Sequence, residues 1–153
     1  LVLWLVYGLI AYFFLGDVRQ AFWAGLVCVD IHWLSDILHQ SGHALAAKST
    51  GYPQKRWIIQ SILLATIYPK NEPELPKSVH YRRALGGVPV SFLIALIAFL
   101  IQPESEFWQY IAHFTFWLNG LVFGLGALMP ANHLMNIGFD LDGDSLLRIW
   151  RQG

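Results

Sequence analysis

The chain has 153 residues, of which 56% are apolar and 13% are charged, and its formal net charge is zero. Soluble domains average about 45–50% apolar and about 25% charged residues. The apolar excess here is gathered in long runs that carry almost no charge. This composition argues against an ordinary water-soluble domain and predicts one membrane-embedded domain over residues 1–153. A neutral chain also lacks the basic surface that a nucleic-acid partner would require.

Apolar runs divide the chain into four candidate membrane spans, and a helix needs about 17–25 mostly apolar residues to cross the hydrocarbon. The first run, residues 1–15, begins without an initiator methionine, so we expect it to be the remainder of a truncated first span. Residues 21–48 predict the second span, residues 84–101 the third and residues 107–129 the fourth. The expected fold class is an all-α membrane protein with about four transmembrane helices.

The polar stretch between the second and third spans, residues 49–83, contains one apolar piece. Residues 57–68 are too few to cross a bilayer as a helix, so we expect them to form a short strand pair or a re-entrant segment at the membrane surface. After the fourth span, residues 130–143 are irregular and comparatively polar. A last short helix is expected over residues 144–151.

Basic residues gather on one side of this four-span arrangement, and cytoplasmic loops of membrane proteins carry an excess of Lys and Arg. Only Arg19 lies on the opposite side. The other basic residues are Lys48, Lys55, Arg56, Lys70, Lys77, Arg82, Arg83, Arg148 and Arg151. The distribution predicts a multi-pass integral membrane protein in which the loop at residues 49–83 and the C-terminus are cytoplasmic.

Two histidines in the second span carry the clearest chemical signal. His39 and His43 are four residues apart in a helical segment, so they lie on one face, one turn apart. Two neutral imidazoles so placed can bind one zinc ion. Such a pair also arises by chance in helices, with the histidines bonded to neighbouring polar groups. Ionisable residues inside a membrane span are usually functional, however, and this favours the metal.

A catalytic zinc ion requires a third protein ligand and an open position for water. Three carboxylates follow the fourth span, at Asp140, Asp142 and Asp144, and Asp142 is the candidate ligand. A calcium loop of the EF-hand kind would need glycine at its sixth position and glutamate at its twelfth. Counted from Asp140, these positions hold Ser145 and Arg151, so the calcium interpretation fails.

The order of these motifs resembles the site-2 protease family of intramembrane zinc metalloproteases. In that family a helix with the motif H-E-x-x-H is completed by the aspartate of an L-D-G motif in a later segment. Residues 39–43 here read His-Gln-Ser-Gly-His, and residues 141–143 read Leu-Asp-Gly. The resemblance implies a zinc ion held by His39, His43 and Asp142, and a transmembrane or membrane-proximal peptide as substrate.

Three positions depart from the family's pattern. Gln40 stands where the family has the glutamate that takes a proton from the zinc-bound water. An amide cannot act as that base, although it can hydrogen-bond the water. Ser91 stands where the family has the asparagine of a Gly-Pro-x-x-Asn stretch, and Ala127 replaces a second asparagine before L-D-G. Ser91 is therefore a candidate for positioning the substrate, and Asn132, with Asn136 as the alternative, is a candidate replacement for the asparagine missing at Ala127.

Two other ionisable residues lie near the zinc-binding face of the second span. Asp36 is three residues before His39 and four before Gln40, which places it near that face. It is a candidate to orient a ligating imidazole by accepting a hydrogen bond. The alternatives are a carboxylate in a water-filled cleft and a replacement for the missing base. His32 is expected to be a hydrogen-bonded interior histidine rather than a ligand.

Two functions are compatible with these residues. The first is a membrane zinc endopeptidase whose activity is weak or absent because Gln40 occupies the general-base position, since a general base typically contributes about 10²–10⁴-fold. The alternative is a non-catalytic relative that keeps the zinc site and binds membrane segments without cleaving them. A di-iron membrane oxidase would need several histidine clusters, and this sequence has one pair with scattered single histidines.

Overall fold

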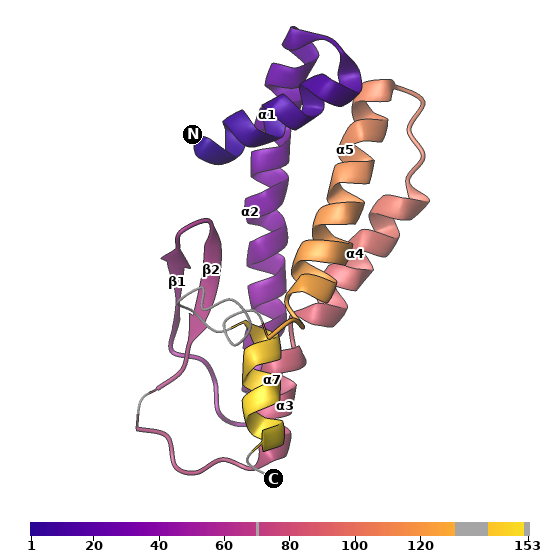
Figure 1. Ribbon diagram of the computed structural model, residues 1–153. Coiled ribbons are helices and arrows are strands. Elements are labelled where there is room, and N and C mark those ends of the chain that lie inside the picture. Colours follow the sequence, from indigo (N-terminus) through magenta and orange to yellow (C-terminus); the bar gives the residue numbers. More distant parts are fainter. Residues whose placement is uncertain (70, 131–140, 152–153) are drawn as a thin grey trace.

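The computed structural model describes residues 1–69, 71–130 and 141–151 and is mostly helical (Figure 1). In chain order the elements are α1 (Val2–Leu15), α2 (Val18–Ser49), β1 (Arg56–Gln60), β2 (Leu63–Ile67), α3 (Lys77–Leu85), α4 (Val88–Leu100), α5 (Glu106–Trp117), the π-helix η1 (Leu118–Gly126) and α7 (Asp142–Arg151). The long helix α2 is the axis of the arrangement, because α1, α3, α4, α5 and β2 all contact it.

Helix α2 begins at a cap that the sequence encodes. The Asp17 side chain accepts a hydrogen bond of 2.7 Å from the backbone N–H of Gln20, which satisfies a free donor of the first helical turn. Just before it, Gly16 ends α1 in the left-handed conformation, with a φ of 67°. The 32 residues of α2 form a helix about 48 Å long at 1.5 Å per residue.

Two helical stretches are long and apolar enough to cross a membrane by length and composition, among the residues that the structure describes. They are α2 and the continuous stretch Lys77–Leu100, which α3 and α4 form together. The four-span count remains a prediction. The helical stretch at the third predicted span begins at Lys77 instead of Ala84, because α3 takes up residues that the sequence had assigned to the polar loop.

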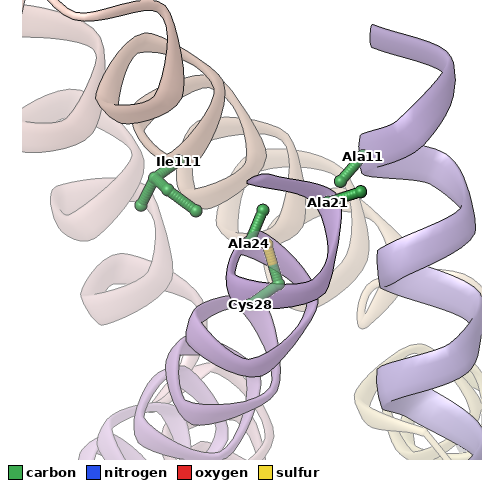
Figure 2. Close-up of a cluster of buried hydrophobic side chains, with 5 residues drawn as sticks. All are labelled: Ala11, Ala21, Ala24, Cys28 and Ile111. Carbon is green, nitrogen blue, oxygen red and sulfur yellow. The ribbon is translucent and has the colours of Figure 1, made fainter. Parts of the chain in front are cut away.

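Small side chains fill the contact of α2 with α1 and α5. Ala11 of α1, Ala21, Ala24 and Cys28 of α2, and Ile111 of α5 form one buried cluster (Figure 2). Alanine side chains let helix backbones approach closely, and small residues dominate helix contacts in membranes for this reason. The cluster fixes the N-terminal half of α2 relative to its neighbours.

Helix α4 buries its small residues and exposes its large ones. Ser91, Ala95 and Ala98 are all at most 6% exposed, whereas Leu93 is 57% exposed and Phe99 is 58% exposed. A water-soluble helix shows the opposite arrangement, with its large apolar side chains turned into the core. Extensive exposed apolar surface marks contact with another apolar phase or partner.

The strands β1 and β2 form an antiparallel hairpin, with Arg56 opposite Ile67 and Gln60 opposite Leu63. Ser61 in the connecting turn has a positive φ of 62°. β2 lies against α2 (Figure 1). Of the two structures expected for residues 57–68, the strand pair is therefore confirmed.

The final helix, α7, begins at Asp142 rather than at the expected residue, Asp144. The Asp144 side chain accepts a hydrogen bond of 3.0 Å from the backbone N–H of Leu141, the residue just before the helix. α7 packs against α3 (Figure 1), and α3 in turn contacts α2. The C-terminal segment is thus returned to the C-terminal part of α2, where the two histidines lie.

Candidate metal centre

His39 and His43 lie on the buried face of α2 with their rings directed at each other. They are 3% and 4% exposed, and their Nε2 atoms are 3.0 Å apart. The spacing of four residues produces this arrangement, because one helical turn separates the two side chains. The face that the sequence predicts for metal binding is therefore assembled in the fold.

The first residue of α7 brings a carboxylate to this pair. Asp142 Oδ2 lies 3.5 Å from His39 Nε2 and 3.2 Å from His43 Nε2. Burial by itself raises the pKa of the Asp142 carboxyl, but the two imidazoles beside it outweigh burial and hold the pKa below its usual value. The carboxylate form, which is the form that binds a metal, is therefore the favoured one.

The three side chains fit a metal ion. Ligand atoms about 2.0–2.1 Å from a tetrahedral zinc ion lie about 3.3 Å from one another. The three pairs of atoms here are 3.0, 3.5 and 3.2 Å apart. Asp142 Oδ2 is also buried without a hydrogen bond of proper geometry among the described residues. His39, His43 and Asp142 thus form a group that could hold a metal ion.

Outer contacts hold both imidazoles with Nε2 directed at this position. His43 Nδ1 donates a hydrogen bond of 2.6 Å to the backbone carbonyl of Arg83, which leaves the Nε2 lone pair of the neutral ring free. His39 Nδ1 lies 2.8 Å from Ser91 Oγ, a side chain that is fully buried. Partners of this kind fix the ring orientation and the tautomer of histidines that bind metals.

Glycines permit the close approaches that build the centre. A Cβ atom at Gly87, between α3 and α4, would lie 2.5 Å from His39 Nε2 and 2.6 Å from His43 Nε2. At Gly143 it would collide with the backbone of Leu128, while the Gly143 N–H donates a hydrogen bond of 2.8 Å to the carbonyl of Ala127. The glycine of Leu-Asp-Gly therefore allows Asp142 to reach the histidines.

The side chain of Arg83 anchors the loop that precedes α3. Its guanidinium donates two hydrogen bonds, of 2.6 and 2.8 Å, to the carboxylate of Glu72 and one of 2.6 Å to the carbonyl of Tyr52. It also lies 4.1 Å from the centre of the Tyr68 ring. The Arg83 hydrogen bonds lower the pKa of Glu72, whereas burial raises the pKa of Tyr68 to about 12.

Gln40 and Asp36 are directed at strand β2. Gln40 Nε2 donates a hydrogen bond of 3.0 Å to the carbonyl of Leu64, and Gln40 Oε1 accepts one of 2.6 Å from the Thr66 hydroxyl. Asp36 Oδ2 accepts a hydrogen bond of 2.5 Å from the Leu64 N–H. Asp36 thus bonds to the hairpin, whereas the histidines take their partners from Ser91 and Arg83.

One cavity of about 980 Å³ adjoins the centre and has His39, Gln40, His43 and Asp142 in its lining. Its other walls come from β2, η1 and α7 and are mostly apolar, with Leu63, Ala65, Leu121, Phe123 and Ile149 among them. Pockets that bind organic ligands are typically about 300–1,000 Å³ and mostly apolar with a few polar groups. An apolar chain segment could therefore lie beside the metal ligands.

The structure brings together the three predicted ligands and places Ser91 directly behind His39. His32 is a hydrogen-bonded interior residue, with Tyr7 and the Ile62 carbonyl as its partners. Asn132 lies outside the described residues. The role of Arg83 was not predicted from the sequence. The available signal was the nearby Gly86-Gly87 pair, which indicates that this segment approaches another helix closely. Nor was the role of Asn119, which is fully buried and donates a hydrogen bond of 2.9 Å to Ser35.

Comparison of the sequence with known protein families finds no family model that matches it. No curated protein and no solved structure matches the chain. The interpretation of the centre formed by His39, His43 and Asp142 therefore depends on its own geometry and on the order of its motifs.

Proposed function

We propose that this chain is the membrane-embedded domain of a zinc endopeptidase of the site-2 protease kind. The observation that carries the proposal is the convergence of His39, His43 and Asp142 beside an apolar cavity. Two imidazole nitrogens and one carboxylate oxygen are a ligand set of catalytic zinc sites, which leave a fourth position open. A zinc ion bound there would lower the pKa of a bound water to about 7 and polarise a peptide carbonyl.

The residues around the metal position have separate tasks in this proposal. Ser91 and the Arg83 carbonyl hold the two imidazoles in place, so no ligand has to reorganise when a peptide enters. The apolar walls at Leu121 and Phe123 receive an apolar peptide segment and exclude bulk water. The substrate class that fits such walls is a transmembrane or membrane-proximal peptide.

Gln40 determines how much hydrolysis the proposed centre can support. Its amide has no basic group that could take a proton from the attacking water. The metal would still supply part of the catalysis, so slow cleavage is the expected activity. The alternative is a non-catalytic protein that keeps the centre and binds membrane segments without cutting them, and Gln40 favours it.

A cleavage assay separates the two functions. The purified full chain, loaded with zinc in detergent, should slowly cleave a labelled apolar transmembrane peptide, and a chelator should stop the cleavage. Reconstitution with zinc should restore it, because the ion supplies the activated water. A peptide that binds to the loaded protein and stays intact on long incubation would reject the peptidase and establish the non-catalytic alternative.

We further propose a multi-pass membrane location, with the loop at residues 49–83 and the C-terminus in the cytoplasm. Three observations support this location. They are the exposed apolar surface of α4, the two helices long and apolar enough to cross a membrane and the one-sided distribution of basic residues. The metal centre would then lie toward the cytoplasmic end of α2.

Cysteine labelling tests this orientation in intact cells. In a Cys28→Ala background, Lys55→Cys should be protected from a thiol reagent that cannot cross the membrane, whereas Glu104→Cys should react. Both side chains are exposed on the protein, so protection reports the membrane rather than burial. Labelling of Lys55→Cys with protection of Glu104→Cys would reverse the topology.

A further inference from the structure

A second line of polar side chains on α2 bonds to the hairpin. His32, Asp36 and Gln40 follow one another at intervals of four residues, so they form one stripe along the helix. All three are at most 8% exposed. Each of them makes a hydrogen bond to the backbone of the hairpin, at Ile62 or Leu64. The stripe therefore fastens the hairpin to α2 by its main chain.

The contacts at Leu64 reproduce those of a neighbouring β-strand. In an antiparallel pair, alternate residues direct both backbone groups away from the partner strand. Leu64 lies opposite Ile59 in the register of the hairpin and is one of these outward-directed residues. Its N–H donates to Asp36, and its carbonyl accepts from Gln40. Side chains of α2 thus supply one acceptor and one donor where the backbone of a further strand would supply them.

We propose that Gln40 is a latch residue that holds β2 against α2, and that its amide is required for this task. The inference does not depend on the proposed peptidase activity, because it concerns the attachment of the hairpin to the helix. Gln40 must donate through Nε2 to the Leu64 carbonyl and accept through Oε1 from the Thr66 hydroxyl at the same time. An amide side chain carries both a donor and an acceptor at its end, whereas an ionised carboxylate of the same length carries acceptors alone.

A glutamate at position 40 would lose one of the two hydrogen bonds that Gln40 makes to β2. An ionised carboxylate only accepts hydrogen bonds, so it could keep the Thr66 hydroxyl but would place its second oxygen against the Leu64 carbonyl. The carbonyl would lose its partner in a half-buried setting, and two acceptors would face each other. The side chain that suits base catalysis and the side chain that holds the strand are therefore chemically incompatible at this position.

The hydrogen bonds from α2 to Leu64 also determine whether the outer edge of β2 can pair with a peptide. A peptide can join a sheet only where unpaired N–H and C=O groups are available to it. At Leu64 both groups are occupied by α2. Release of Gln40 from Leu64 would expose the edge that faces the metal cavity, since Leu64 and Gln40 both line that cavity.

Hydrogen exchange at the Leu64 amide reports whether β2 stays docked on α2, because this N–H donates to Asp36 while Gln40 holds the carbonyl of the same residue. Exchange would be followed in the full chain in detergent for the parent, for Gln40→Glu and for Gln40→Met, which keeps the length of the side chain but has no N–H donor. Leaving a buried backbone group unpaired corresponds to roughly a fivefold or larger change in an opening equilibrium. We therefore expect exchange at Leu64 to rise about fivefold or more in both variants. Gln60→Glu, which adds the same charge at the end of β1, should stay within about twofold of the parent on the same scale.

Parental exchange at Leu64 in correctly folded Gln40→Glu and Gln40→Met would overturn the proposal. If both variants fail to fold, Thr66→Val decides the question, because it removes the hydroxyl that lies 2.6 Å from Gln40 Oε1 and 3.2 Å from Gln54 Oε1 and leaves Gln40 itself unchanged. Faster exchange at Leu64 in Thr66→Val supports the latch, and unchanged exchange rejects it. Exchange in α4 serves as the internal reference in every variant, since the hydrogen bonds described for Gln40, Leu64 and Thr66 all join the hairpin to α2 or to Gln54.

Discussion

Asp142→Ala protein should retain far less than the one zinc ion per chain that we expect for the parent. Asp142 is the only carboxylate that lies with His39 and His43 in a metal-binding group in the described part of the chain. Losing a residue that merely supports a ligand typically weakens metal binding about 10–100-fold. Losing a direct ligand should weaken it by more than about 100-fold on that scale. Metal analysis of the purified protein and a competition assay with a zinc indicator measure the effect.

His39→Ala and His43→Ala should give the same result, since each removes one imidazole from the group. Two exposed residues provide matched controls. Asp30→Ala removes a carboxylate from α2, and His113→Ala removes an imidazole from α5, so both should keep the zinc content of the parent. Full zinc content in a folded Asp142→Ala protein would show that the third ligand is another residue.

Gln40→Glu should leave the zinc content unchanged and raise peptide hydrolysis by about 10²-fold or more, the usual contribution of a general base. Glutamate has nearly the shape of glutamine, so the metal centre should still assemble. The new carboxylate cannot hold the Leu64 carbonyl, which frees it to accept a proton from the attacking water. Initial rates of peptide cleavage, compared at equal zinc loading, measure the gain.

Two results would contradict this account of Gln40. If the parent chain already cleaves as fast as Gln40→Glu, another group is the base, and Asp36 is the first residue to test. Its Oδ1 atom is buried without a hydrogen-bond partner among the described residues, and the side chain lines the cavity. If neither form cleaves while both hold zinc, the changes at Ser91 and Ala127 have removed substrate positioning, and the non-catalytic function is preferred.

Local patterns in the sequence predicted the group that could hold a metal ion and one of the two structures expected for residues 57–68. Helical periodicity placed His39 and His43 on one face, the Leu-Asp-Gly motif of the resembled family pointed to Asp142, and the length of the apolar piece at residues 57–68 indicated either a strand pair or a re-entrant segment. The partners of these residues depend on tertiary contacts, which no spacing reveals. Ser91 meets His39 only because α4 crosses α2 at Gly87, so its place behind a ligand was not predictable.

The contacts of Gln40 were also not predictable from the sequence. The sequence marks Gln40 only because it lacks the basic group that the resembled family has at this position. Its bonds to Leu64 and Thr66 depend on where the hairpin docks on α2. These two partners are 24 and 26 positions away from Gln40 in the chain. Asp36 likewise accepts a hydrogen bond from a strand N–H, whereas one interpretation of the sequence had it accept from an imidazole.

Arg83 joins two parts of the molecule that sequence alone would treat as separate. Its backbone carbonyl accepts a hydrogen bond from the ring of His43. Its guanidinium donates hydrogen bonds to Tyr52 and Glu72 in the loop that precedes α3. The loop is the segment that we place at the cytoplasmic surface. A binding partner that draws Glu72 away from Arg83 would therefore act on the His43 ring without entering the cavity, because one residue links the loop to the buried histidine pair.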